Sequence, residues 1–287
     1  MRALLIVMAG LAATPAIAAP RIPSAIYTDP VRDIKYPARM EVLHIPSGDV
    51  EINAVAYLAS GAGPHPTIII CHGLPGNEKN LDLAQAIRRA GWNAITFNYR
   101  GSWGSPGSYR FAQNPADAGA VLAYLRSPEA AKALGINTLR IVMAGHSMGG
   151  WATAQTAARD NGLAGAILIS AANMGQLGKM PRADLVKRME GNLESLRGTS
   201  PEIMADEIIA NAAAFDFVAG ATAMTSKPLL VLTSDDGLAP MSDALVAEVR
   251  KGGGKNVTAV HVATDHSWSD KRIRLQAEIL NWLTKLR

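Results

Sequence analysis

The chain has 287 residues, a formal net charge of +4 at pH 7 and a hydrophobic content of 48%. This length can bury a sizeable core without covalent cross-links, and the composition excludes a disordered chain. The sequence has no long run of Lys and Arg and no interleaving of basic with aromatic residues, so nucleic-acid binding is not expected.

The N-terminal residues have the pattern of an export signal. Met1-Arg2 supplies a positive charge, Ala3 to Ala13 form an uncharged apolar stretch, and Ala16-Ile17-Ala18 is a small-x-small pattern that signal peptidases accept. The apolar stretch is too short to span a bilayer comfortably. We therefore predict a signal peptide over residues 1–18 and a periplasmic or secreted protein with no stable membrane insertion after cleavage. The alternatives are an uncleaved membrane anchor and a buried first helix.

The single cysteine, Cys71, ends the apolar run that begins at Thr67. One thiol cannot form an internal disulfide, so the stability of an exported chain must come from its core. We expect Cys71 to behave as a small buried hydrophobe rather than as a nucleophile.

Residues 19–39 are rich in Pro and lack periodicity, which indicates an extended arm. The remaining residues, 40–287, alternate short apolar segments with longer amphipathic ones, as strands and helices do when they follow one another. Met40–Ile45 and Val50–Leu58 predict an antiparallel hairpin. Strands buried on both faces are expected at residues 67–71, 93–97, 139–144, 166–170, 229–233 and 257–262.

Apolar residues at helical spacing predict helices at residues 80–90, 116–125, 241–250 and 271–286, and another directly after Ser147. Because strands and helices alternate, the fold class is α/β. We predict one domain with a mostly parallel, doubly wound sheet and helices on both of its faces.

Residues 173–226 interrupt this alternation, because they carry no strand signal. Apolar residues from Leu185 through Leu196 predict one helix, and Ser200-Pro201 begins a second. We predict a helical cap insertion above the carboxyl edge of the sheet, where open α/β sheets bind substrates. The alternative is a structural elaboration away from the site.

Gly145-His146-Ser147-Met148-Gly149-Gly150 follows an expected strand and precedes an expected helix. In such a strand-turn-helix setting, the glycines leave room for the backbone to reverse and the serine hydroxyl stands clear of the sheet. The helix N-terminus favours developing negative charge. Ser147 is therefore the candidate nucleophile.

A serine hydroxyl needs a base that a carboxylate orients. His266 fits the base, because it lies in the loop after the last expected strand. His261 lies within that strand, and His146 should point away from the nucleophile. The carboxylate should follow the preceding strand, where Asp235 and Asp236 are both candidates.

The tetrahedral intermediate of acyl transfer also needs hydrogen-bond donors for its oxyanion. The segment Cys71 to Gly76 follows an early central strand, and its glycines let the loop fold close to Ser147. The backbone N–H groups of Leu74 and Met148 are the expected donors, since Pro75 has none. The sequence contains no ligand pattern for a metal and no phosphate-binding glycine loop after the first strand, so no cofactor is expected.

These motifs resemble those of the α/β-hydrolase superfamily of serine hydrolases, from about Met40 to the end of the chain. His72 to Gly76 resembles the oxyanion loop, Gly145 to Gly150 the nucleophile elbow, and Asp265-His266-Ser267 the histidine loop. The resemblance implies the chain order serine, aspartate, histidine.

Asp236-Gly237-Leu238-Ala239-Pro240 resembles the acid turn of this superfamily, where a proline commonly follows four residues after the aspartate. The resemblance therefore favours Asp236 over Asp235. Thr233 departs from the pattern, since Gly often stands before the acid turn. The segment Asn98 to Ser102 resembles prolyl oligopeptidase-like peptidases and bacterial esterases, and we favour a structural role for Arg100.

The expected function is hydrolysis of a small carboxylic ester through an acyl-Ser147 intermediate. An exported peptidase or amidase acting on short peptides is the alternative. It would need acidic anchors for a free amino-terminus, for which Glu190, Glu194, Glu202 and Glu207 in the insertion are candidates. A noncatalytic binding protein on the same fold is the third possibility, against which the complete set of Ser147, Asp236 and His266 argues.

Overall fold

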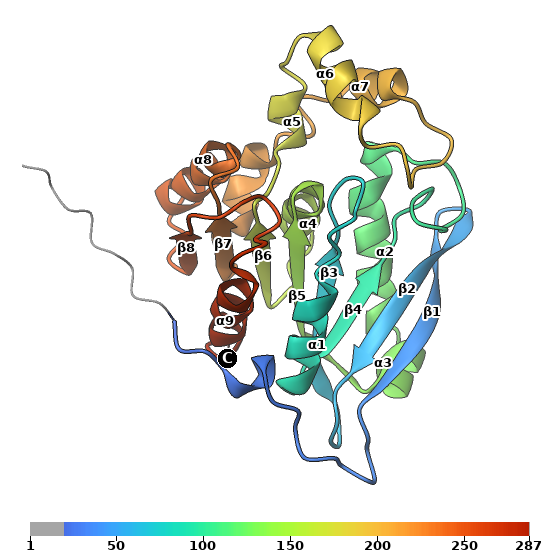
Figure 1. Cartoon of the computed structure of the whole chain (residues 1–287), viewed down its shortest axis with the longest axis vertical. Coiled ribbons are helices and arrows are strands. Elements are labelled where there is room, and N and C mark those ends of the chain that lie inside the picture. Colours follow the sequence, from blue (N-terminus) through green and yellow to red (C-terminus); the bar gives the residue numbers. More distant parts are fainter. Residues whose placement is uncertain (1–19, 287) are drawn as a thin grey trace, which may run out of the picture.

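A computed structural model describes residues 20–286 of the chain (Figure 1). The predicted signal peptide lies outside the described residues. Eight strands form one sheet in the order β1-β2-β4-β3-β5-β6-β7-β8. Their bounds are β1 Arg39–Ser47, β2 Val50–Leu58, β3 His65–Cys71, β4 Asn93–Phe97, β5 Ile136–His146, β6 Gly165–Ile169, β7 Leu229–Thr233 and β8 Val257–His261. Only β2 runs antiparallel to its neighbours, β1 and β4; the other pairs are parallel.

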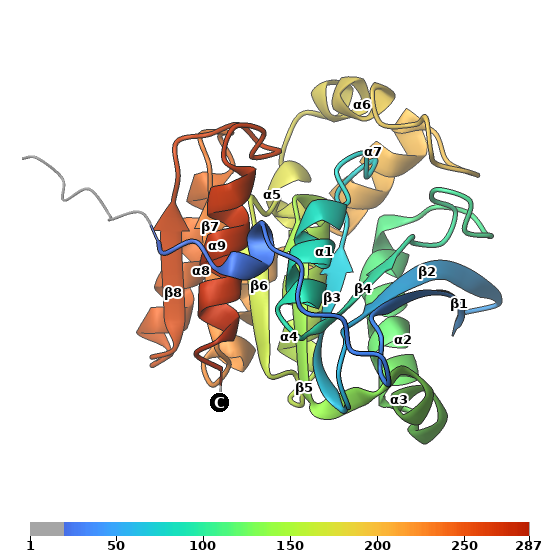
Figure 2. The same cartoon turned by 60° about the horizontal axis from the view of Figure 1, so that its bottom comes forward.

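Helices cover both faces of the sheet (Figure 2). The α-helices are α1 Leu81–Arg89, α2 Asn114–Arg126, α3 Pro128–Leu134, α4 Met148–Arg159, α5 Met174–Leu177, α6 Arg182–Glu190, α7 Pro201–Ala210, α8 Ala239–Lys251 and α9 Arg272–Leu283; the short 3-10 helices are η1 Ser24–Ile26, η2 Phe111–Gln113 and η3 Phe217–Met224. Because side chains alternate along a strand, Ile68 and Ile70 of β3 pack with α1 and α9, whereas Ile69 and Cys71 pack with α2 and α4. The predicted doubly wound sheet is confirmed.

One predicted strand differs from the structure, and one helix was not predicted. The strand expected to be buried on both faces at residues 257–262 is the edge strand β8, in which Thr258, Ala259 and His261 are exposed. It has a neighbour on one side only, so its outer residues meet solvent. The helix α3 was not predicted. It begins where the Ser127 hydroxyl accepts the N–H of Ala130 (3.2 Å).

The segment from residue 173 to 226 carries α5, α6, α7 and η3, and Figure 1 shows α6 and α7 beyond the carboxyl ends of the central strands. The helix predicted from Leu185 through Leu196 is shorter than expected, because α6 ends at Glu190 before Gly191. Leu196 instead forms an isolated antiparallel bridge with Ser102. The segment after α6 therefore rests on the loop that follows β4.

The arm ahead of β1 lies against the domain. Arg89 of α1 donates hydrogen bonds from Nε to the carbonyl of Ala25 (2.5 Å) and from a terminal nitrogen to that of Ile26 (3.0 Å). No helix among residues 20–286 is long and apolar enough to cross a membrane.

A buried carboxylate joins three elements on the α2 side of the sheet. Asp117 of α2 is fully buried and accepts hydrogen bonds from the Ser47 hydroxyl (2.6 Å), the Arg100 backbone N–H (2.9 Å) and Arg100 Nε (2.6 Å). Arg100 thus anchors the loop after β4 to α2 and β1, in the structural role expected of it.

Asp117→Ala should destabilise the protein by about 3 kcal/mol or more, because it leaves the largely buried Arg100 guanidinium without its partner. Urea unfolding followed by circular dichroism measures this. The matched control is Asp206→Ala, which breaks the Arg182–Asp206 pair, whose side chains are 54% and 55% exposed. It should leave the unfolding midpoint unchanged. Equal losses of stability from the two substitutions would show that the buried Arg100–Asp117 pair contributes no more than the exposed Arg182–Asp206 pair.

Candidate active site

Ser147 lies in a tight turn between β5 and α4, with φ 58° and ψ −123°. The turn is fixed from β6: the Ser147 N–H donates to the Ile169 carbonyl (2.9 Å), and its own carbonyl accepts the Ala172 N–H (3.0 Å). A Cβ on Gly145 would overlap the carbonyl of Gly149, and one on Gly149 would overlap the carbonyl of Cys71. The glycines are therefore required by close backbone contacts, as predicted from the motif.

His266 lies in the loop after β8 and is bonded to a carboxylate from the loop after β7. Its Nδ1–H donates to Asp236 Oδ2 at 2.7 Å. The Asp236 side chain is only 4% exposed, and its other oxygen accepts the N–H of Leu238 (2.9 Å). Asp235, the alternative, points elsewhere: its Oδ1 lies 3.0 Å from Nε2 of the half-exposed His261.

The environment of Asp236 favours its charged form. Burial by itself would raise the pKa of this carboxyl, but the hydrogen bonds from His266, the Leu238 N–H and Ser234 outweigh that effect and lower the pKa to about 2. The carboxylate is therefore ionised at neutral pH and can hold a proton on Nδ1 of His266.

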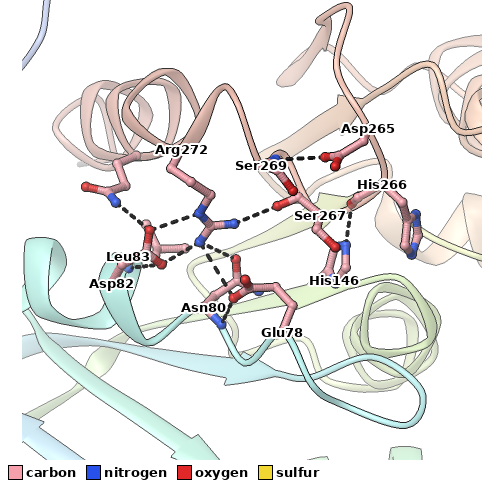
Figure 3. Close-up of polar contacts among 11 residues, drawn as sticks. Glu78, Asn80, Asp82, Leu83, His146, Asp265, His266, Ser267, Ser269 and Arg272 are labelled. Carbon is pink, nitrogen blue, oxygen red and sulfur yellow. Dashed lines mark hydrogen bonds and ion pairs between the residues drawn. The ribbon is translucent and has the colours of Figure 1, made fainter.

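His266 lies beside the residue that precedes Ser147. The rings of His146 and His266 are 4.6 Å apart between centroids, and His146 Nε2–H donates to the carbonyl of His266 at 2.7 Å. Figure 3 shows His146 directly against the histidine loop. This contact was missed from the sequence. Among the described residues, no hydrogen bond joins the Ser147 hydroxyl to His266 Nε2.

The loop after β3 passes close to Ser147. A Cβ on Gly73 would lie 3.0 Å from the Cβ of Ser147, so the backbone of this loop lies close to Ser147, as predicted. Neither the Leu74 N–H nor the Met148 N–H donates to another group of residues 20–286. Both expected donors therefore lack an acceptor among the described residues, as an oxyanion role would require.

Two side chains that the sequence did not single out hold this loop in place. The Pro75 carbonyl accepts hydrogen bonds from the Trp103 indole Nε1–H (2.6 Å) and the Ser195 hydroxyl (3.2 Å). Trp103 follows β4, and Ser195 follows α6. The loop beside the nucleophile is thus tied to the insertion.

A third unpredicted side chain, Arg272 of α9, holds the histidine loop (Figure 3). Its guanidinium donates to the carbonyl of Ser267 (3.0 Å), to Asn80 Oδ1 (3.0 Å) and, through Nε, to Asp82 Oδ2 (2.9 Å). It therefore fastens the histidine loop to the start of α1.

Two of the four glutamates considered as peptide anchors are hydrogen-bonded within the fold. The Glu207 carboxylate accepts the N–H groups of Phe111 (2.9 Å) and Ala112 (2.8 Å) at the start of η2, which is a structural use. Glu202 accepts the hydroxyl of Ser200, and both Glu190 and Glu194 are exposed.

Residues 20–286 contain no group of three or more His, Cys, Asp or Glu side chains placed to hold a metal ion. Cys71 is fully buried, and burial raises the pKa of its thiol to about 12. This keeps the thiol protonated, in agreement with the structural role expected of it.

Several solved structures share this fold. An esterase from Pyrobaculum calidifontis is 19% identical with a TM-score of 0.66, covering 88% of each chain. A thermostable carboxylesterase cloned from a metagenomic library is 19% identical with a TM-score of 0.63, covering 92% of each chain. An acylaminoacyl peptidase from Pyrococcus horikoshii is 15% identical with a TM-score of 0.65, covering 86% of this chain and 41% of that one.

The search of curated proteins finds no match. The sequence profile of the Alpha/beta hydrolase family matches residues 68–276, which include most of β3, the Ser147 turn, the insertion and the histidine loop. The eight-stranded sheet and the fold of the similar structures agree with that match. The chain therefore belongs to the alpha/beta hydrolase family.

Proposed function

We propose that this hydrolase cleaves carboxylic esters with Ser147 as nucleophile, His266 as base and Asp236 as the orienting acid. The observation that carries the proposal is the 2.7 Å hydrogen bond from His266 Nδ1 to the buried Asp236 carboxylate, formed beside the Ser147 turn. With its Nδ1 proton held by Asp236, neutral His266 has an unprotonated Nε2, as a general base for Ser147 requires.

The reaction has two halves. Ser147 Oγ attacks the ester carbonyl carbon while its proton passes to His266 Nε2, and the resulting oxyanion is stabilised by the N–H groups of Leu74 and Met148. The intermediate then collapses as His266 returns the proton to the leaving alcohol oxygen, which leaves Ser147 acylated. A water molecule, deprotonated by His266, attacks the acyl-enzyme and releases the acid. Asp236 stabilises the imidazolium that forms in each half.

Two observations favour an ester over a peptide substrate. The esterase structures are matched over nearly their whole length, whereas the peptidase is matched over 41% of its chain. Glu207, one of the four candidate anchors for a free amino-terminus, is already engaged by backbone N–H groups. The sequence pattern of residues 1–18 supports the further proposal that the enzyme acts in the periplasm or after secretion.

Ser147→Ala should abolish turnover, with a loss in kcat of at least about 10⁴-fold, because no other group forms the acyl intermediate. A fluorophosphonate probe should label the wild-type protein at Ser147 and leave the variant unlabelled. Circular dichroism should show the same unfolding midpoint for both proteins. Full activity in the folded variant would exclude Ser147 as the nucleophile.

The substrate class is tested by comparing hydrolysis of p-nitrophenyl esters of rising acyl length with that of free and amine-blocked aminoacyl arylamides. We expect kcat/KM to be highest for an ester, and the acyl length at which it falls gives the size of the acyl pocket. A higher kcat/KM for an arylamide with a free amine, lost on blocking, would identify an aminopeptidase instead.

The lowered pKa of Asp236 predicts an acid-dependent loss of stability. Its folded-state pKa of about 2 lies below the ordinary value of 3.8, so the ionised carboxylate stabilises the fold above pH 4 and this contribution is lost as pH falls through 2. The free energy of unfolding should be higher for the wild type than for Asp236→Asn at pH 5. This difference should fall by about 2 kcal/mol between pH 5 and pH 2. Denaturant titrations at several pH values measure it.

Asp235→Asn serves as the control for that substitution, because its carboxylate faces the half-exposed His261 rather than His266. It should retain ester hydrolysis, whereas Asp236→Asn should lose about 10⁴-fold in kcat, as removal of the orienting acid does in other triads. The reverse ranking would assign the acid to Asp235.

A further inference from the structure

We propose that His146 is a positioning residue for the base: it fixes the main chain of His266 relative to Ser147. This inference rests on the proposed function. His146 is the last residue of β5, is 4% exposed and directly precedes Ser147. Its Nε2–H donates to the carbonyl of His266 at 2.7 Å, so a single side chain connects the turn of the nucleophile to the loop of the base.

The hydrogen bond defines the tautomer of His146. A backbone carbonyl only accepts, so the proton must be on Nε2. Burial, assisted by the neighbouring His266, lowers the pKa of His146 to about 4, so the ring is neutral at pH 7 and has no proton on Nδ1.

The other edge of the ring faces the loop after β3. A Cβ on Gly73 would lie 3.5 Å from His146 Nδ1, and Nδ1 has no hydrogen-bond partner among the described residues. His146 therefore lies between the Gly73 backbone and the His266 backbone. It is not a second base, because its Nε2 already donates to a carbonyl and its Nδ1 faces Gly73.

A second side chain also bonds to the main chain of the histidine loop. Arg272 donates to the carbonyl of Ser267 (3.0 Å), the residue after His266, but it comes from α9 and connects the loop to α1 (Figure 3). Asp236 orients the imidazole ring and does not contact the main chain of His266. Among these three contacts, only the one from His146 connects the main chain of the base directly to the residue that precedes the nucleophile.

Because catalysis depends on placement to within about 1 Å, loss of this contact should slow proton transfer without changing how substrate binds. His146→Met removes the donor and keeps an unbranched side chain of similar length. His146→Gln has the same length and restores an N–H donor. We expect the Met variant to lose about 10- to 100-fold in kcat with KM within about twofold of wild type, and the Gln variant to recover most of that loss.

A second measurement does not depend on either variant folding. In wild-type protein labelled with ¹⁵N-histidine, His146 should show at pH 7 the ring nitrogen shifts of a neutral imidazole protonated at Nε2. A cationic ring, or protonation at Nδ1, would overturn the proposal. So would a folded Met variant with wild-type kcat, or a folded Gln variant as slow as the Met variant.

Failure of this inference is distinguishable from failure of the proposed function. If fluorophosphonate labels Ser147 in the wild type while His146→Met keeps full kcat, only the role of His146 is wrong. If Ser147→Ala remains active and the probe labels nothing, the proposed function fails, and the positioning role fails with it.

Discussion

The site depends on a backbone-to-backbone contact between the Ser147 turn and the end of β3. Any side chain at Gly149 would overlap the carbonyl of Cys71, and any at Gly145 would overlap the carbonyl of Gly149. Since these positions carry only hydrogen atoms, α4 can begin directly against β3. This brings the loop that starts at His72 within van der Waals reach of the nucleophile.

The loops around Ser147 are ordered by side chains that satisfy their carbonyl groups. Trp103 and Ser195 hold the carbonyl of Pro75, and His146 and Arg272 hold those of His266 and Ser267. An unpaired buried carbonyl is costly, so each of these bonds restricts where the loop can go. The functional groups themselves are thus placed by residues that take no part in the proposed chemistry.

Local patterns in the sequence were sufficient for most of the fold. The strands were recognisable from apolar runs, and the Ser147 turn from its glycines between a strand and a helix. The predictions that failed concern packing between distant segments: β8 is apolar enough for a buried strand, yet no strand within residues 20–286 pairs with its outer edge. Likewise, the contact of His146 with His266 joins residues 120 positions apart, and no local pattern records it.

The bond from Ser195 to the Pro75 carbonyl joins the insertion to the loop that carries a proposed oxyanion donor. Ser195 belongs to the insertion, and Pro75 directly follows Leu74, the proposed oxyanion donor. An outward displacement of Ser195 would remove a hydrogen bond from the Pro75–Gly76 peptide group, in the same loop as that donor. By thermodynamic linkage, a substrate that bound the Leu74 N–H more tightly when the Ser195 bond is formed would stabilise that bond by the same free energy. In the proposed reaction, the position of the oxyanion donor is therefore coupled to the position of the insertion.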